Sequence, residues 1–274
     1  MATRSPAETP LMRQYLDVKD KHPDAIIFFR LGDFYEMFFE DAVLGARLLD
    51  LTLTTRDKGK EDAVPMCGVP HHASRGYVAK LTELGHKVVM CEQVEDPKLA
   101  KGLVKREVVR IITPGVVLDD EVLEPKKPRY VAAIVRTDKQ CGLAYLDATT
   151  GELRATELPI AALFDELVRV APREIVFAAN ELRDGGPLAP IRARFKTAWN
   201  PAPIPNETDA RRELGPLVVV GEQLSPTAVR AAGAVVAYAR STQPVGALPL
   251  AKLVSYRPGD SVVLDEAAIA NLEL

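Results

Sequence analysis

The sequence has few aromatic residues, few cysteines and no excess of positive charge. Its 274 residues include 6% aromatics, one tryptophan and three cysteines. The cysteines (Cys67, Cys91 and Cys141) are odd in number and form no Cys-x-x-Cys pair, so we expect reduced thiols rather than a disulfide framework. No run approaches 18 apolar residues, and the leader MATRSPAETP has no apolar segment. We therefore expect a soluble cytoplasmic protein with no membrane partner.

Bulk charge does not indicate a nucleic-acid-binding protein. Lysine and arginine total 35 against 38 aspartates and glutamates, and residues 1–117 hold 17 of each sign. Any contact with DNA would therefore have to come from local geometry rather than from a basic patch.

A phosphate-binding loop is also missing. No Gly-Lys pair is followed by serine or threonine, so the pattern G-x-x-x-x-G-K-[ST] does not occur. We expect no ATPase, no bound cofactor and no enzyme activity in these residues.

Residues 1–117 alternate between strand and helix patterns, which predicts an α/β domain. Thr9 and Pro10 are typical of a helix start, and His22-Pro23 of its end. The apolar patterns predict strands at 25–29, 63–69, 86–94 and 108–115, and helices at 40–49 and 74–85. Residues 118–129 are charged and contain proline, which indicates a linker.

The second half predicts a different domain at 130–250. Three strand patterns at 130–137, 141–149 and 152–158 are separated by hairpin-length turns. A helix at 159–170, a strand at 173–179 and a helix at 225–240 follow, which favours an RNase H-like mixed sheet. Residues 242–260 contain three prolines and look irregular, and DEAAIANLEL begins a new helix. We interpret 251–274 as the start of a further, truncated domain.

The segment GDFYEMF at 32–38 allows two interpretations. In one, the aromatics are core, Asp33 caps the following helix and Glu36 is a solvated residue. In the other, the Gly-Asp turn presents Phe34 to solvent with the Glu36 carboxylate two positions later. An exposed aromatic can wedge between base steps from the minor groove and kink the duplex. A mispaired step resists this less, so such a wedge would select mismatches by deformability.

Four blocks decide between these interpretations by resemblance. FFRLGDFYEMF, VPMCGVPHHA, LTELGHKVVMCEQVEDP and KGLVKREVVRIITPG resemble bacterial MutS proteins in order and approximate spacing. LDATTGEL and YRPGDSVVLDEAAIANLEL resemble the connector domain and the entry to the core domain of that family. The resemblance implies a mismatch-recognition domain at 1–117 and a connector at 130–250, without the ATPase of the full-length family.

The resemblance also implies site residues. Phe34 would stack on the mispaired base, Glu36 would hydrogen-bond to it, and Met66 would touch the minor groove beside them. Tyr35 would point into the core. We hypothesise that DNA raises the pKa of Glu36, so that its carboxyl donates a proton to a base acceptor.

Two groups of basic residues are candidates for contacts with DNA phosphates, which set register without reading sequence. Arg56 and Lys58 lie in one polar loop with Lys60, and Lys105 and Arg106 lie near Lys98, Lys101 and Arg110. Because residues 1–117 are neutral overall, we expect this part alone to bind DNA weakly.

Further partners and cofactors are implied only by the resemblance. Mismatched duplex DNA and MutL, the latter through the connector, would be partners. A homodimer, ATP and magnesium would belong to the full-length protein, and these residues alone would be monomeric.

The alternatives are enzymatic or structural. Asp147 on a strand of an RNase H-like sheet would suit a metal-dependent nuclease, but no other carboxylates occupy evident strand positions. Cys67, His71, His72 and Cys91 could imitate a zinc site, although their spacing fits no zinc finger. A purely structural fragment with buried aromatics is the third possibility.

Overall fold

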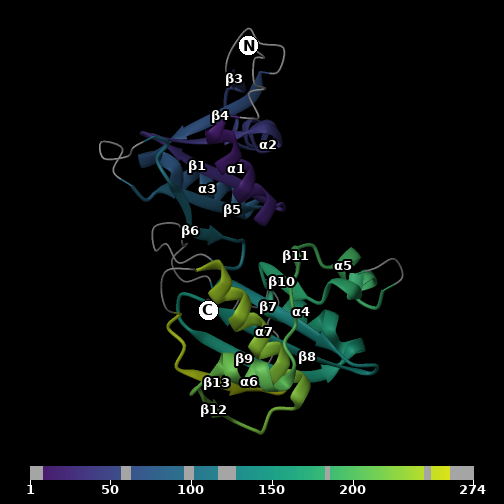
Figure 1. The fold of residues 1–274 in the computed structure, drawn as a ribbon. Helices are drawn as coiled ribbons and strands as arrows, with labels where there is room; N and C mark the ends of the chain where they lie inside the picture. The colour runs from purple at the N-terminus through teal and green to yellow at the C-terminus, as the bar shows by residue number, and fades with distance from the viewer. Residues whose placement is uncertain are drawn as a thin grey trace, which may run out of the picture. The chain divides into compact units, whose positions relative to one another are not determined.

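The computed structural model describes residues 9–56, 63–95, 102–116, 128–182, 186–243 and 248–259. The chain divides into two compact units, and Figure 1 shows their strands and helices. The first unit comprises residues 1–125 with 242–247, and the second comprises 126–241 with 248–274. Both units are α/β with mixed sheets, as predicted.

The first unit is built on a six-stranded sheet in the order β3-β4-β2-β1-β5-β6. Strands β1 and β5 are parallel, and the other pairs are antiparallel. The strands are β1 (Ala25–Leu31), β2 (Phe34–Phe38), β3 (Thr54–Arg56), β4 (Val64–Pro70), β5 (Lys87–Gln93) and β6 (Arg106–Ile112). The helices are α1 (Pro10–Lys21), α2 (Phe39–Leu49) and α3 (Ser74–Glu83), with a 3-10 turn at His71–Ala73.

Helix α1 begins where the capping residues predicted it. The Thr9 side chain accepts a hydrogen bond from the Met12 N–H, and Pro10 occupies the first helical position. Leu11, Met12 and Tyr15 are buried, which gives the helix one apolar face toward the sheet.

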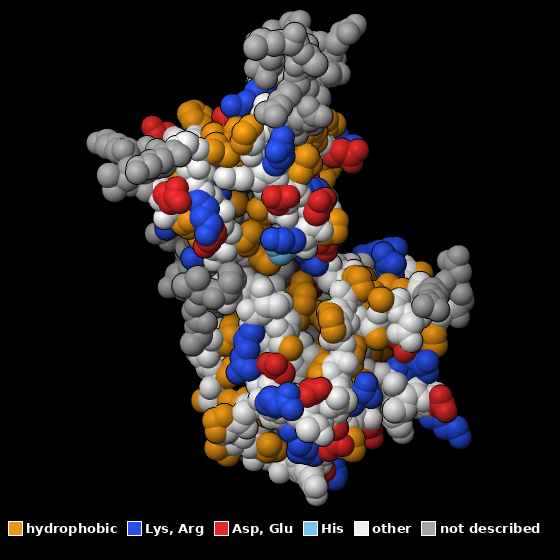
Figure 2. All heavy atoms as spheres, in the orientation of Figure 1, with side chains coloured by type: hydrophobic (Ala, Val, Ile, Leu, Met, Phe, Trp, Pro, Cys, Tyr) orange, Lys and Arg blue, Asp and Glu red, His pale blue; other side chains and the backbone are white. Residues whose placement is uncertain are grey.

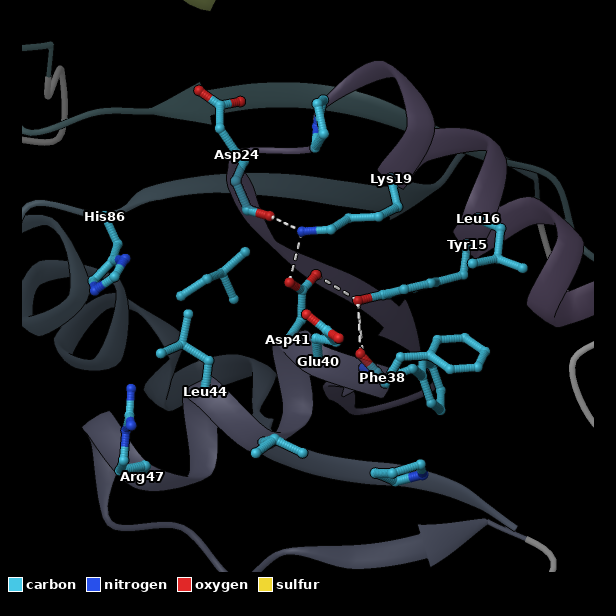
Figure 3. A pocket seen from close by; sticks show the side chains of 16 residues that line it. Tyr15, Leu16, Lys19, Asp24, Phe38, Glu40, Asp41, Leu44, Arg47 and His86 are labelled. Carbon is cyan, nitrogen blue, oxygen red and sulfur yellow. Dashed lines mark hydrogen bonds and ion pairs between the residues drawn. The ribbon is translucent and has the colours of Figure 1, made fainter. Parts of the chain in front are cut away.

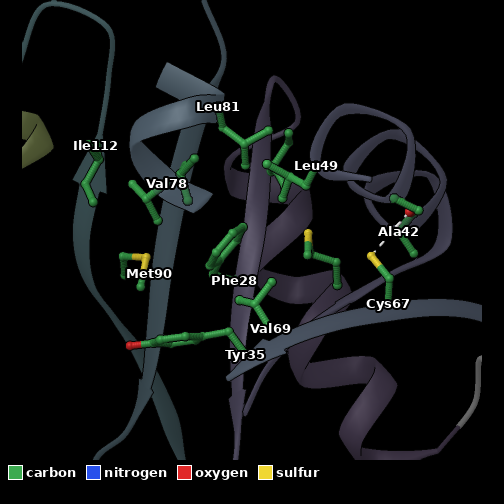
Figure 4. Packing of buried hydrophobic residues seen from close by; sticks show 14 residues of the cluster. Phe28, Tyr35, Ala42, Leu49, Cys67, Val69, Val78, Leu81, Met90 and Ile112 are labelled. Atoms are coloured by element: carbon green, nitrogen blue, oxygen red, sulfur yellow. Dashed lines mark hydrogen bonds between the residues drawn. The ribbon is translucent and has the colours of Figure 1, made fainter. Parts of the chain in front are cut away.

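Two hydrophobic clusters lie on opposite faces of this sheet. Helices α2 and α3 pack over the cluster that contains Phe28, Tyr35 and Met37 (Figure 4). Helix α1 packs over the cluster that contains Phe29 and Phe38. Because successive strand residues point to opposite faces, this arrangement sets which residues of β2 face which helix.

A buried polar network ties α1 and α2 to the central strands (Figure 3). The Asp41 carboxylate accepts hydrogen bonds from the Tyr15 hydroxyl at 2.6 Å, Lys19 Nζ at 2.7 Å and the Ile27 N–H at 3.1 Å. Tyr15, Lys19 and Asp41 line a pocket of about 830 Å³. A buried carboxylate is stable only when its oxygens accept hydrogen bonds. These bonds to Asp41 therefore hold the start of α2 directly after β2.

The second unit has a seven-stranded sheet in the order β11-β10-β7-β8-β9-β13-β12. Strands β7, β8 and β9 form the two predicted hairpins, and β10 and β11 continue the sheet in parallel beside β7. The strands are β7 (Tyr130–Arg136), β8 (Gln140–Asp147), β9 (Glu152–Pro159), β10 (Glu174–Phe177), β11 (Ala198–Pro201), β12 (Val218–Val220) and β13 (Lys252–Ser255). This is the mixed sheet predicted for the connector.

Within the described part of this unit, four helices accompany the sheet: α4 (Leu163–Val170), α5 (Ala189–Arg194), α6 (Glu207–Leu214) and α7 (Pro226–Thr242). Short 3-10 turns lie at Ile160–Ala162 and Ala179–Leu182. Helix α7 packs so closely on β8 that a Cβ atom at Gly142 would lie 2.3 Å from the Thr227 carbonyl oxygen. Gly142 is therefore required for the close approach of helix and strand.

The prediction that residues 242–260 are irregular was wrong in part. Residues 252–255 form β13, which pairs in parallel with both β9 and β12. The prolines around it masked the pattern, because a four-residue strand is too short to show a clear alternation. Most of the predicted linker (118–129) and the helix expected after residue 264 lie outside the described residues. Within the residues that are described, no helix is long and apolar enough to cross a membrane.

Candidate nucleic-acid interface

A tight hairpin between β1 and β2 carries the candidate wedge. Leu31 pairs with Phe34, so Gly32 and Asp33 alone form the turn. Gly32 has φ +57° and Asp33 does not have a positive φ, as in a type II′ hairpin turn. The His71 N–H donates to the Asp33 carbonyl at 2.8 Å, which fixes the turn to the end of β4. Asp33 is therefore a turn residue and does not cap a helix.

Alternation along β2 separates Phe34 and Glu36 from their neighbours. Phe34 is 47% exposed, whereas Tyr35 and Met37 are buried on the opposite face among the side chains drawn in Figure 4. The Tyr35 hydroxyl donates to Glu92 and its ring packs on Phe28, so Tyr35 points into the core as predicted. The interpretation in which all these aromatics are core is wrong for Phe34.

Glu36 lies on the same face as Phe34, between a phenylalanine and a glycine. Its pairing partners are Phe29 on β1 and Gly68 on β4. A Cβ atom at Gly68 would come within 3.4 Å of the Glu36 Cγ, so the glycine leaves this side of the carboxylate uncovered. Arg56 Nη1 lies 3.8 Å from Glu36 Oε2. Among the described residues, that buried oxygen has no hydrogen-bond partner.

The electrostatics of Glu36 combine two opposing effects. Burial raises the pKa of the carboxyl above its usual value, and the positive charges of Arg56 and Arg106 oppose this rise. The net direction is upward, so Glu36 takes up a proton more readily than a solvent-exposed glutamate. Such a group can donate a hydrogen bond once a ligand removes it further from water.

Met66 shares this face of the sheet. It pairs with Phe38 on β2 and with Thr54 on β3, two residues before Gly68. Its side chain is partly buried and packs against the cluster under α1. Met66, Glu36 and Phe34 therefore lie on one face of adjacent strands.

The residues predicted to contact phosphates differ in their exposure to solvent and in the hydrogen bonds that their side chains already form. Arg106 is partly buried and donates to the carbonyls of Arg30 at 2.6 Å and Val104 at 2.8 Å. Its guanidinium lies 5.1 Å from the centre of the Phe29 ring. Arg106 therefore helps to hold the fold together. The basic residues around it in the sequence gave no sign of this structural role.

The other basic candidates are more exposed. Lys105 is exposed and forms an ion pair with Glu107 at 2.5 Å, whereas Lys58 lies outside the described residues. The Arg56 side chain is 40% exposed. Figure 2 shows basic and acidic side chains interspersed on the visible face, in keeping with the neutral composition.

The geometry does not favour the alternative metal sites. Cys67 pairs with Met37 and faces α2, whereas Cys91 lies in the cluster under α1 on the other face of the sheet. The Asp147 carboxylate caps its own turn, accepting from the N–H groups of Thr149 at 2.9 Å and Thr150 at 3.3 Å. In the described part of the chain, no three His, Cys, Asp or Glu residues are grouped to hold a metal ion.

Comparison with known proteins gives matches over nearly the whole chain. Residues 9–121 match the family model of MutS domain I, and residues 129–249 match that of MutS domain II. The chain is 44% identical to the DNA mismatch repair protein MutS of Myxococcus xanthus, with 97% of the chain covered. It is 46% identical to the protein of that name in Anaeromyxobacter sp. strain K over 98% of the chain, and 41% identical to that in Syntrophobacter fumaroxidans over 97%. In each case it spans 31% of the relative's length. The chain therefore belongs to the MutS family, of which it carries domains I and II.

Proposed function

We propose that the first unit recognises mispaired or unpaired bases in duplex DNA, with Phe34 as the wedge and Glu36 as the hydrogen-bonding group. The exposure of Phe34 directly after the two-residue turn of the β1–β2 hairpin carries this proposal. The residue is 47% exposed, although its aromatic neighbours Tyr35 and Phe38 are buried. The relatives that the chain matches are named DNA mismatch repair proteins, which agrees with this function.

Insertion of Phe34 between base steps would unstack them at a cost of a few kcal/mol. A mispaired step has already lost part of its pairing, so the same insertion costs less there. The two-residue turn and its hydrogen bond from His71 hold the backbone of Phe34 in place, so little backbone freedom would be lost when the ring enters the groove. Discrimination then follows from the deformability of the duplex rather than from a base code.

Glu36 would add a hydrogen bond that only a displaced base can accept. In a matched duplex the carboxylate would remain charged near the phosphates, which is unfavourable. Met66 would contact the minor groove on the same face. Arg56, Lys58 and Lys105 would supply phosphate contacts, and Arg106 would do so only by leaving its carbonyl partners.

The second unit would act as a connector and not as a nuclease. Because Asp147 is engaged in its own turn, nothing in the described residues supports cleavage. We propose that domain II offers a surface to MutL and that homodimer formation, ATP and magnesium belong to the remainder of a full-length protein. We also propose that the mismatch-recognition domain ends at residue 117 and that the connector spans residues 130–250. A cytoplasmic location is a further part of the proposal.

The function can be tested with two duplexes of the same sequence, one fully paired and one with a single mispair. A full-length protein carrying this chain should bind the mispaired duplex roughly 5- to 150-fold more tightly, because stacking of one base on an aromatic contributes ~1–3 kcal/mol. Fluorescence anisotropy at fixed salt gives both dissociation constants. Equal constants for the two duplexes would contradict the proposed function.

A further inference from the structure

Arg56 and Glu36 form an ion pair that reaches across a strand. Arg56 is the last residue of β3 and Glu36 lies in β2, with β4 between them. The Nη1–Oε2 distance is 3.8 Å, which allows charge attraction but is too long for a hydrogen bond. A partly exposed pair of this kind contributes little to stability and can be exchanged for other partners.

Both members of the pair have unused capacity. Glu36 Oε2 is buried and accepts no hydrogen bond among the described residues. The Arg56 side chain forms no hydrogen bond to the described residues, and it is 40% exposed. An arginine can bind a phosphate through two parallel N–H groups, which is stronger than a single long ion pair.

The other groups that face Glu36 cannot replace Arg56 as an ion-pair partner that is able to move to a phosphate. Phe29 on β1 and Gly68 on β4 are uncharged. Arg106 on β6 is the second positive charge near the carboxylate, and its guanidinium is held by the Arg30 and Val104 carbonyls. Of the two arginines, Arg56 is therefore the one that is free to move.

We propose that Arg56 is a specificity-determining residue, which exchanges its ion pair with Glu36 for a DNA phosphate only when a mispaired base takes the Glu36 carboxyl by a hydrogen bond. The proposal rests on the proposed function of Glu36. It goes further in assigning to Arg56 a phosphate contact that depends on the state of the base, whereas an ordinary phosphate contact is made on any duplex.

The exchange follows from charge balance. On a mispaired duplex, a proton from solvent binds Glu36 Oε2, and the resulting O–H donates to the base acceptor. The carboxyl is then neutral, so Arg56 loses its counter-charge and pairs with a phosphate. On a matched duplex, Glu36 stays ionised and retains Arg56. Mismatch binding thus neutralises one phosphate more than matched binding.

Salt dependence measures this difference directly. The slope of log affinity against log salt is about −0.9 per phosphate neutralised on B-form DNA. For a full-length protein carrying this chain, we expect a slope steeper by about 0.9 on the mispaired duplex. Arg56→Gln should remove that difference by reducing the mispaired slope alone. If it reduced both slopes equally, or changed neither, the proposal would be overturned.

Two variants complete the experiment. Glu36→Gln removes the counter-charge, so Arg56 should reach a phosphate on both duplexes. The slope of log affinity against log salt on the matched duplex should then become steeper by about 0.9. Arg47→Gln is the matched control, because this exposed arginine lies on α2, the helix over the opposite face of the sheet. It should leave both slopes unchanged. If the wild-type protein bound the mispaired duplex more tightly but showed equal salt slopes on the two duplexes, the exchange alone would be overturned. If it bound both duplexes equally tightly, the proposed function would be overturned as well.

Discussion

Replacing Phe34 by alanine is expected to abolish most of the preference for mispaired DNA. Phe34 is 47% exposed, so a large part of its surface remains available to a ligand and its loss is expected to affect the complex with DNA. Stacking between a base and an aromatic contributes ~1–3 kcal/mol, which corresponds to a roughly 5- to 150-fold loss of affinity for the mispaired duplex. Affinity for the matched duplex should change by less than about threefold, since no ring is inserted there.

The stability of the variant separates this effect from misfolding. A solvent-exposed substitution usually changes the free energy of unfolding by less than about 0.5 kcal/mol, and urea denaturation can verify this for Phe34→Ala. Leu84→Ala is a suitable control, because Leu84 is a comparably exposed apolar residue at the end of α3. A Phe34→Ala protein with intact mismatch preference would show that the wedge assignment is incorrect.

Glu36→Ala is expected to have the second large effect. Removing the carboxyl leaves the base acceptor without its hydrogen bond inside the contact, which costs about 1–3 kcal/mol and corresponds to a roughly 5- to 150-fold loss on the mispaired duplex. Glu36→Gln keeps a donor but carries no charge. It should retain mismatch affinity and bind the matched duplex about fivefold more tightly, because one repulsion of ~1 kcal/mol is lost.

The pH dependence gives the sign of the proton transfer. Burial raises the pKa of Glu36 in the free protein, and DNA would raise it further. A proton is then taken up on binding, so mismatch affinity should fall as pH rises between the free and bound pKa values. Glu36→Gln should remove this dependence. A wild-type affinity that rises with pH would contradict proton donation, and an unchanged matched affinity in Glu36→Gln would contradict the charge penalty.

Much of the architecture could be predicted because its signals are local. Short apolar runs defined β1, β4 and β5, and the Thr9-Pro10 cap defined the start of α1. Strands β3 and β12 have three residues each, which is too short for a periodic pattern. Helix α6 was missed because only Ala210 and Leu214 are buried in it. Its Asn206 cap, which accepts from the Asp209 N–H, was an available signal.

The site was less predictable because its interactions connect distant residues. The blocks containing Phe34, Glu36 and Met66 were recognised by resemblance, and the strand register brings these residues to one face. Arg106 looked like one of several solvated basic residues, yet its partner carbonyl belongs to Arg30, 76 positions earlier. The proximity of Arg56 to Glu36 likewise depends on β4 lying between their strands. Local sequence patterns cannot predict contacts between residues that are far apart in the sequence.

The most direct test of the wedge is cross-linking from the mispaired base itself. A duplex with 5-iodouracil at the mispaired position, irradiated in complex with a full-length protein carrying this chain, should cross-link to an aromatic ring stacked on it. We predict that mass spectrometry will find the cross-link on the peptide containing Phe34, and that the same base in a correct pair will give none. A cross-link of equal yield from the paired base, or one confined to peptides without Phe34, would contradict the insertion of this ring.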